Sequence, residues 1–124
     1  EKKELMIHFY DQGVGIPATL PLKYPKEMIH SALRNLGIIG SRDGEHILAA
    51  MEIGRTRTDL PNRGRGLNDL RAFVDQSGTG NLRILSRKGE YEYSADKSEV
   101  ARNHKHSLGG TLIQWSVSLP SVTA

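Results

Sequence analysis

The chain has 124 residues, of which 37% are hydrophobic and 25% charged, a balance typical of one folded domain rather than a disordered segment. It contains no cysteine, which excludes disulfides, zinc–thiolate sites and cysteine nucleophiles and fits a cytoplasmic location. No apolar run approaches the ~18–20 residues of a membrane helix, so we expect no membrane segment. The 17 Lys and Arg against 14 Asp and Glu leave a net charge of only +3, which argues against nucleic acid as the partner.

The first half of the chain predicts one strand and two helices. Residues 5–10 alternate as a strand that places Leu5, Ile7 and Phe9 on one face. Glycines and a proline make residues 11–17 a loop. Apolar residues at helical spacing then predict a helix over 28–36 and a second helix from Asp43 to about Gly54.

The second half predicts a helix followed by strands. Residues 55–66 are polar and rich in Arg and Gly and predict a loop, and 67–77 carry the apolar spacing of a third helix. A turn at Arg87-Lys88-Gly89 predicts a hairpin between short strands at 82–86 and 90–94.

The last part of the chain is a polar segment followed by a strand. Residues 96–107 are polar and predict a loop. Residues 111–119 alternate as the clearest strand, with Trp115 on the apolar face and therefore in the core. Strands grouped after helices indicate a two-layer α+β sandwich, a mixed and mostly antiparallel sheet with its helices on one face.

Three glycine motifs stand next to these elements. The segment Asp11-Gln12-Gly13-Val14-Gly15-Ile16 follows the first strand, and Gly64-Arg65-Gly66-Leu67 precedes the third helix. Gly109-Gly110-Thr111 opens the last strand. Each motif alone is most often a turn or a close packing contact, so only their combination and order point to a ligand site.

The chemistry of the first and third motifs fits a purine ring. A carboxylate at Asp11, fixed at a strand end and buried, would accept a hydrogen bond from the exocyclic amine of adenine. Gly13 and Gly15 lack a Cβ and let the backbone approach a flat ring closely. Thr111 offers a hydroxyl at the base of the last strand.

The chemistry of the second motif fits phosphate. Gly64 and Gly66 stand where a helix start exposes free N–H groups, which together with the helix dipole favour an anion. Arg63 and Arg65 add positive charge there. We therefore expect a cavity between the Asp11 carboxylate and the glycines at 64 and 66.

With these three motifs the chain resembles the ATP-binding domain shared by sensor histidine kinases, anti-sigma kinases, gyrase-type ATPases and ATP-driven chaperones. The resemblance covers nearly the whole chain and implies one histidine-kinase-like ATP-binding domain over 1–124. It implies that Asp11 reads adenine, that Ile16 and Leu67 belong to the binding motifs, and that 18–63 holds a lid over the nucleotide. It further implies a regulatory protein kinase, of the sensor or anti-sigma type, that acts in signal transduction with a protein partner.

Two features depart from that family. Its upstream helix supplies an Asn that helps to bind Mg²⁺ and in several members a catalytic Glu, and only ten residues precede Asp11 here. We therefore expect a domain truncated on its N-terminal side, with ATP as cofactor, Mg²⁺ without its usual ligand, and catalytic residues upstream. The second departure is an insertion at about 91–108, expected to form an extra hairpin arm.

Alternatives remain beside this reading. The same fold could serve as a non-catalytic interaction domain with no nucleotide, and nucleic-acid binding through the arginine-rich segment ranks last. His104 and His106 form an H-x-H pair that could share a metal on a strand, but no third ligand stands at a suggestive spacing and we expect no metal site.

Overall fold

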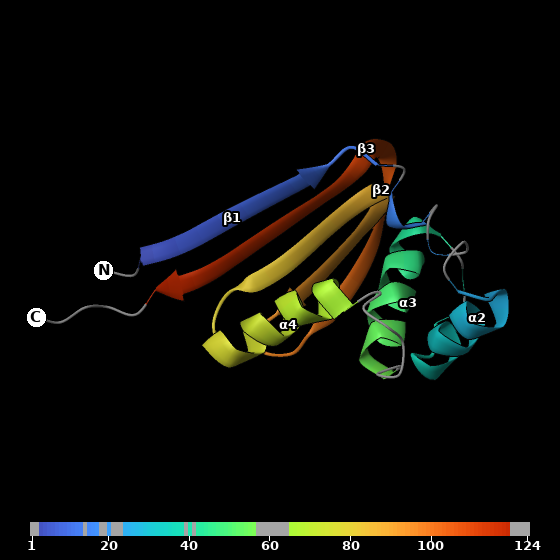
Figure 1. Cartoon of the computed structure of the whole chain (residues 1–124), viewed down its shortest axis with the longest axis horizontal. Coiled ribbons are helices and arrows are strands. Elements are labelled where there is room, and N and C mark those ends of the chain that lie inside the picture. The colour runs from blue at the N-terminus through green and yellow to red at the C-terminus, as the bar shows by residue number, and fades with distance from the viewer. Residues whose placement is uncertain are drawn as a thin grey trace, which may run out of the picture.

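The computed structural model describes residues 3–13, 15–17, 20, 24–38, 40, 42–56 and 65–119. They form an antiparallel sheet, in the order β1-β3-β2, with helices on one face (Figure 1). The strands are β1 (Lys3–Asp11), β2 (Asn81–Ser94) and β3 (Glu99–Leu119), and the helices are α2 (Lys26–Asn35), α3 (Asp43–Thr56) and α4 (Arg65–Ser77). The predicted α+β two-layer architecture is confirmed.

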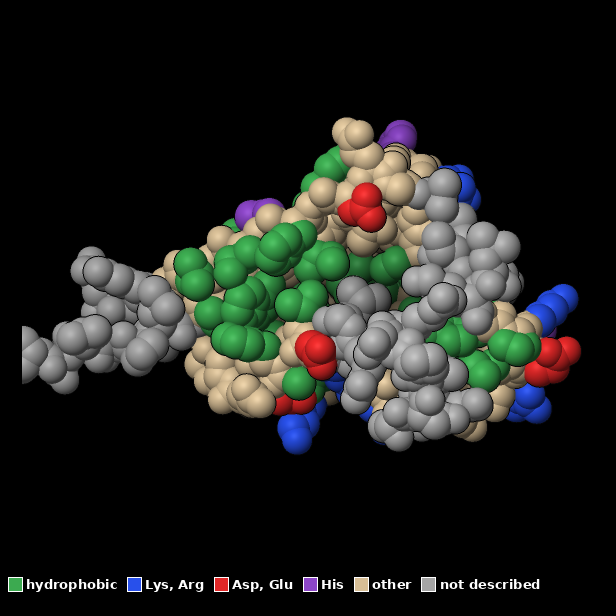
Figure 2. Space-filling view, in the orientation of Figure 1, with side chains coloured by type: hydrophobic (Ala, Val, Ile, Leu, Met, Phe, Trp, Pro, Cys, Tyr) green, Lys and Arg blue, Asp and Glu red, His purple; other side chains and the backbone are tan. Residues whose placement is uncertain are grey.

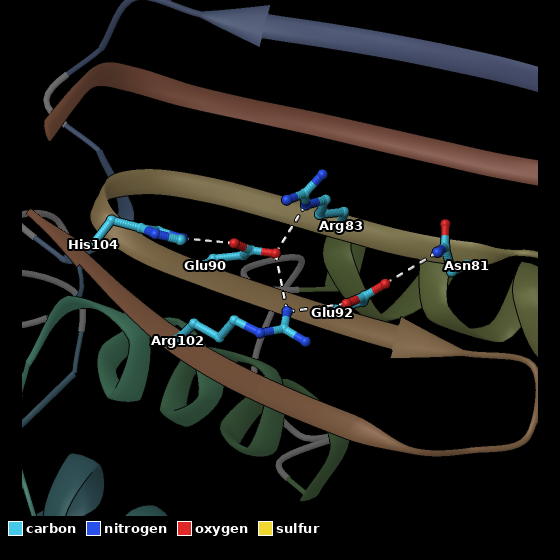
Figure 3. A network of polar contacts seen from close by, with 6 residues as sticks. All are labelled: Asn81, Arg83, Glu90, Glu92, Arg102 and His104. Carbon is cyan, nitrogen blue, oxygen red and sulfur yellow. Dashed lines mark hydrogen bonds and ion pairs between the residues drawn. The ribbon is translucent and has the colours of Figure 1, made fainter. Parts of the chain in front are cut away.

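β2 turns back on itself between Arg83 and Glu90, so that its two halves lie side by side (Figure 3). Arg87, within this segment, has a positive φ of 53°, a conformation found in tight turns. The backbone N–H of Ala95 donates to the Gly80 carbonyl 3.1 Å away, which closes the far end of this hairpin. The hairpin predicted at this turn is confirmed.

β3 pairs with both halves of β2. Its second half lies between β1 and the first half of β2, with Trp115 opposite Ile7 on one side and Leu82 on the other. Its first half runs along the second half of β2, from Glu99 opposite Tyr93 to Asn103 opposite Gly89. The second half of β2 and the first half of β3 form the arm, which corresponds to the extra hairpin arm expected for the insertion at about 91–108.

The prediction of a loop over 96–107 is wrong beyond residue 98, because β3 begins at Glu99. Polar residues make a good strand here because one face of the arm meets solvent and holds cross-strand ion pairs. The loop predicted over 55–66 is also too long. Arg55 and Thr56 end α3, Arg65 and Gly66 begin α4, and 57–64 lie outside the described residues.

The core has two parts that share α3. One cluster lies between the sheet and the two helices α3 and α4, and the other between α2 and α3. α3 contributes Ile47 and Met51 to the first and Ala49 and Ile53 to the second. This double burial explains why its sequence is apolar nearly all round. Trp115 is buried as predicted.

Helix contacts with the sheet fall mainly on β2 and β3, so the helix-facing side of β1 stays open. Leu5 and Phe9 face the helix layer, yet they remain 41% and 55% exposed. Phe73 of α4 stacks edge-on against Trp115, with ring centroids 4.4 Å apart, and is itself exposed. Figure 2 shows hydrophobic side chains gathered in one broad area beside β1 and above α4.

Candidate functional site

Three side chains form a polar row across the end of the sheet. Asp11 at the end of β1 pairs with Thr111 of β3, which in turn pairs with Ser86 of β2. Cross-strand partners project to the same face, so all three lie on the helix-facing side. The Ser86 and Thr111 hydroxyl oxygens are 2.8 Å apart, and Ser86 is fully buried. The fold thus brings the first and third motifs together, from opposite ends of the chain.

Ser86 also holds the loop that follows Asp11. Its hydroxyl oxygen accepts the Ile16 backbone N–H at 2.8 Å and lies 3.3 Å from the Gly110 carbonyl, to which the hydroxyl donates. One buried hydroxyl therefore links β2 to both glycine motifs. A buried hydroxyl with several partners keeps its neighbours in one arrangement, because every broken contact leaves an unpaired polar group.

Two glycines of these motifs leave no room for a side chain. Gly15 has a φ of +94°, and a Cβ there would meet the Ser86 hydroxyl oxygen at 2.9 Å. Gly110 has a φ of +107°, and a Cβ there would lie 2.0 Å from the Asp11 carbonyl oxygen. These two positions require glycine because their backbones pack directly against β2 and against the end of β1.

The expected burial of Asp11 is wrong, because this residue is exposed. It lies on the edge strand β1, whose helix-facing side is open to solvent, so neighbouring residues give it little cover. The carboxylate is nevertheless positioned, because its Oδ1 accepts the backbone N–H of Gly13 at 3.1 Å. The remaining acceptor sites of the carboxylate are accessible to solvent.

The second motif lies at the start of α4. Arg65, Gly66 and Leu67 lie in the first turn of this helix, which begins two residues earlier than predicted, while Arg63 and Gly64 lie outside the described residues. The predicted cavity between Asp11 and the glycines at 64 and 66 therefore stays a prediction.

The arm fixes α4 in place. The hydroxyl of Tyr93 donates to the Asp75 carboxylate, and Arg71 forms an ion pair with Glu99 at 3.2 Å. The Arg71 guanidinium also stacks 4.7 Å from the centre of the Tyr93 ring. Burial, together with the hydrogen bond to Glu99, raises the pKa of Tyr91, which lies beside this group. The arm is thus joined to the helix that begins with the second motif.

On the opposite face of the sheet, Glu90 is the centre of a polar network (Figure 3). Its side chain is buried beneath three partners: Arg83 at 2.8 Å, Arg102 at 3.1 Å and His104 at 2.6 Å. Burial alone would raise the pKa of Glu90, but hydrogen bonds from Arg83 and His104 and the charges of the two arginines outweigh it and lower the pKa. This network joins the two halves of β2 to the first half of β3.

In the part of the chain that the structure describes, no three His, Asp or Glu side chains come together in a way that could hold a metal ion. His104, one member of the H-x-H pair, is bonded to Glu90.

Ser86 is the residue of this site that sequence reasoning missed. It follows Leu82 and Ile84 at strand spacing, on the apolar face. A lone serine that continues an apolar alternation is the signal that could have revealed it, because a buried hydroxyl needs specific partners.

No protein-family model, curated protein or solved structure matches this chain. Among the described residues, no helix has the length and apolar character to cross a membrane.

Proposed function

We propose that this chain is an adenine-nucleotide-binding module of the histidine-kinase-like ATPase class. The observation that carries the proposal is the polar row of Asp11, Thr111 and Ser86, flanked by glycines that cannot be replaced without a clash. The order of the motifs, the antiparallel sheet and the helix that begins at Arg65 agree with this class. Because the class rests on a resemblance, its test is nucleotide binding itself.

In this proposal the open side of the row receives the base. The Asp11 carboxylate accepts the adenine amine, and Thr111 assists through its hydroxyl or a water. Gly13 and Gly15 let the ring approach the backbone, while Ile16 adds apolar contact. An adenine ring there would supply the cover that Asp11 lacks, and a hydrogen bond to a charged acceptor strengthens as water is excluded.

The first turn of α4 takes the phosphates in this proposal. Backbone N–H groups of Gly64, Gly66 and Leu67 and the side chains of Arg63 and Arg65 supply donors and positive charge. The contacts of Arg71 and Asp75 with Glu99 and Tyr93 of the arm hold the middle and the end of this helix, and the proposal places the triphosphate at its start.

The proposed lid over 18–63 is limited by α3. This helix is fixed in the core through Ile47 and Met51, so any rearrangement on nucleotide binding must leave it in place. We expect weak or no turnover from these 124 residues alone, since phosphoryl transfer also needs a metal and a positioned nucleophile or base. A longer parent protein is proposed as a cytoplasmic regulatory kinase with a protein partner.

Calorimetric titration with ATP, ADP and GTP tests the adenine assignment. We expect Asp11→Asn to weaken ATP binding about tenfold to a hundredfold, the value of a hydrogen bond to a charged group. GTP should bind more weakly than ATP, because its base has a carbonyl where adenine has the amine. Asp96→Asn, at the exposed turn of the arm, is the matched control and should bind like the parent. Equal affinity of the Asp11→Asn variant and the parent would remove the assignment.

The second candidate is a non-catalytic interaction domain with the same fold. The observation that favours it is the open apolar face formed by Leu5, Phe9 and Phe73. Thermal denaturation separates the two functions, because a ligand that binds only the native state must raise the melting temperature. A rise with ATP or ADP supports the nucleotide module, and an unchanged melting temperature at millimolar nucleotide supports the interaction domain.

A further inference from the structure

A cavity of about 460 Å³ lies beside the start of α3, apart from the polar row. Its walls come from the residues just before and at the start of α3, from the turn of β2 and from the first half of β3. The residues that line it are Arg42, Asp43, Lys88, Asn103, His104 and Lys105. All of these side chains are polar or charged, so the cavity suits a polar ligand.

Backbone packing and hydrogen bonds fix the walls. A Cβ on Gly44 would lie 2.5 Å from the Arg102 carbonyl oxygen, and one on Gly89 would lie 2.5 Å from the Asp43 carbonyl carbon. The Gly44 N–H donates to Asn103 Oδ1 at 2.8 Å, and Asn103 Nδ2 donates to Glu45 at 2.7 Å. α3 and the arm therefore meet in one rigid arrangement with the cavity between them.

The acidic and amide groups around the cavity already have partners within the fold. Asp43 Oδ2 accepts the Lys88 backbone N–H at 2.9 Å. Both polar atoms of the Asn103 side chain are used, and the Gly44 amide in the first turn of α3 is bonded to it. An anion in the cavity would therefore be held by side-chain cations rather than by the helix end.

The positively charged side chains around the cavity have fewer partners within the fold. Arg42 is largely exposed and lies 4.0 Å from Glu45, a weak pair in water. Within the described ranges, no ion pair joins Lys88 or Lys105 to another residue, and both side chains are exposed. Three permanent positive charges thus line the cavity against the single carboxylate of Asp43.

We propose that this cavity binds a phosphate-bearing anion with more than one negative charge. Lys and Arg side chains are the usual protein donors to phosphate oxygens, and converging cations favour a multiply charged anion over chloride. The volume lies within the range of small-molecule sites and accommodates a pyrophosphate group. The site is independent of the proposed nucleotide site, because none of its lining residues belongs to the three glycine motifs.

The first test is an NMR titration of the whole chain with pyrophosphate at constant ionic strength. Amide shifts should gather at residues 42–43, 88 and 103–105. Shifts at the first turn of α4 or at the Asp11 loop, or none that exceed those caused by sodium sulfate, would overturn the proposal. The Asp11→Asn variant should keep its pyrophosphate affinity, which separates this site from the adenine site.

The second test compares charge-neutral variants by calorimetry. Lys88→Gln and Lys105→Gln should each weaken pyrophosphate binding about tenfold, because each removes a charge-assisted contact. Lys26→Gln, at the start of α2 and outside the cavity, is the matched control and should bind like the parent. Parental affinity in the Lys88→Gln, Lys105→Gln double variant would contradict the proposal. Since all three lysines are exposed, their melting temperatures should match that of the parent.

A competition experiment tests whether the phosphate groups alone are recognised. The experiment uses the Asp11→Asn variant with its cavity saturated by pyrophosphate. If only phosphate groups are recognised, ATP competes with pyrophosphate through its phosphates alone. Tripolyphosphate and ATP should then displace pyrophosphate equally well. Displacement by ATP but not by tripolyphosphate would show that the base, rather than the phosphate groups, is recognised, and would overturn the proposal.

Discussion

On its helix-facing side, the sheet is covered by helices along β2 and is open to solvent along β1. Along β2, α3 and α4 cover the face, and Leu82 is 0% exposed, with Tyr91 and Tyr93 equally buried. Along β1, the equivalent face carries Leu5 and Phe9, which remain 41% and 55% exposed. Both strands have the same alternation of apolar residues, so burial here is decided by which strand the helices reach rather than by the pattern.

This difference also sets the chemistry of the two ends. At the closed end, polar groups such as Tyr93 and Asp75 are paired with each other and fasten α4. At the open end, Asp11 keeps acceptor capacity on a fixed backbone. A ligand at β1 would therefore meet a carboxylate with spare acceptor capacity, whereas Tyr93 and Asp75 are already paired with each other.

The largest expected effect comes from a matched pair of leucines on this face. Leu82→Ala should lower the free energy of unfolding by about 2–5 kcal/mol, because it leaves a cavity in the closed part of the core. Leu5→Ala should cost only about 1 kcal/mol, since roughly half of that side chain already meets water. Urea denaturation of both variants measures the difference, and equal losses would show that β1 is covered in solution.

The next effect concerns the glycines that open the second half of β3. Gly110→Ala should cost about 1–3 kcal/mol, because the new Cβ meets the Asp11 carbonyl and the residue must keep a positive φ. Gly109→Ala is the control, since a Cβ there meets nothing within 4 Å. Thermal denaturation should separate the two variants, and equal melting temperatures would refute the close packing of β3 on Asp11.

Glu90 gives a smaller effect that depends on pH. Its pKa lies below its ordinary value of 4.5, so the network stabilises the fold above about pH 4.5 and loses this contribution as the pH falls through the lowered pKa. Glu90→Gln should cost about 1 kcal/mol at pH 7, since Arg83 and Arg102 are partly exposed and screened by water.

Denaturation of the parent and of the Glu90→Gln variant at pH 7 and at pH 3 measures this contribution. The two proteins should differ at pH 7, and the difference should shrink as the pH falls below about 4.5. The groups that face Glu90 from neighbouring strands are Arg83, Arg102 and His104, with Glu92 beside them. A difference that grows toward acid would contradict the direction of the shift.

The smallest effect is expected at the open end. Phe9→Ser should change the free energy of unfolding by less than about 1 kcal/mol, because more than half of the side chain is exposed. It should nevertheless reduce the fluorescence of a dye that binds apolar surfaces, since it removes part of an exposed apolar area. A variant that binds as much dye as the parent would place the dye on another surface.

Periodicity predicted the elements whose faces differ in polarity. The three helices and the strand at 111–119 follow from apolar spacing, and the fold class follows from their order. The strand from Glu99 could not be read this way, because its support is ion pairing with β2 rather than apolar alternation. Local polarity alone does not reveal a partner strand.

The site was predicted in part. Glycine spacing pointed to Asp11 and Thr111, and the register places them opposite each other. Ser86 was missed, because its only signal is that it continues the alternation of Leu82 and Ile84, and that signal does not show which groups it contacts. The exposure of Asp11 could not be predicted either, because it depends on where the helices end on the sheet.

The register of β1 has a consequence for how the chain assembles. In the described sheet this strand pairs only with β3, with Asp11 opposite Thr111, a partner far along the chain. Such a distant pairing carries a loop-closure cost that local contacts do not, so it should form late in folding. The hydroxyl of Ser86 contacts both the Ile16 amide and Thr111, so the polar row should be completed only when β1 has docked.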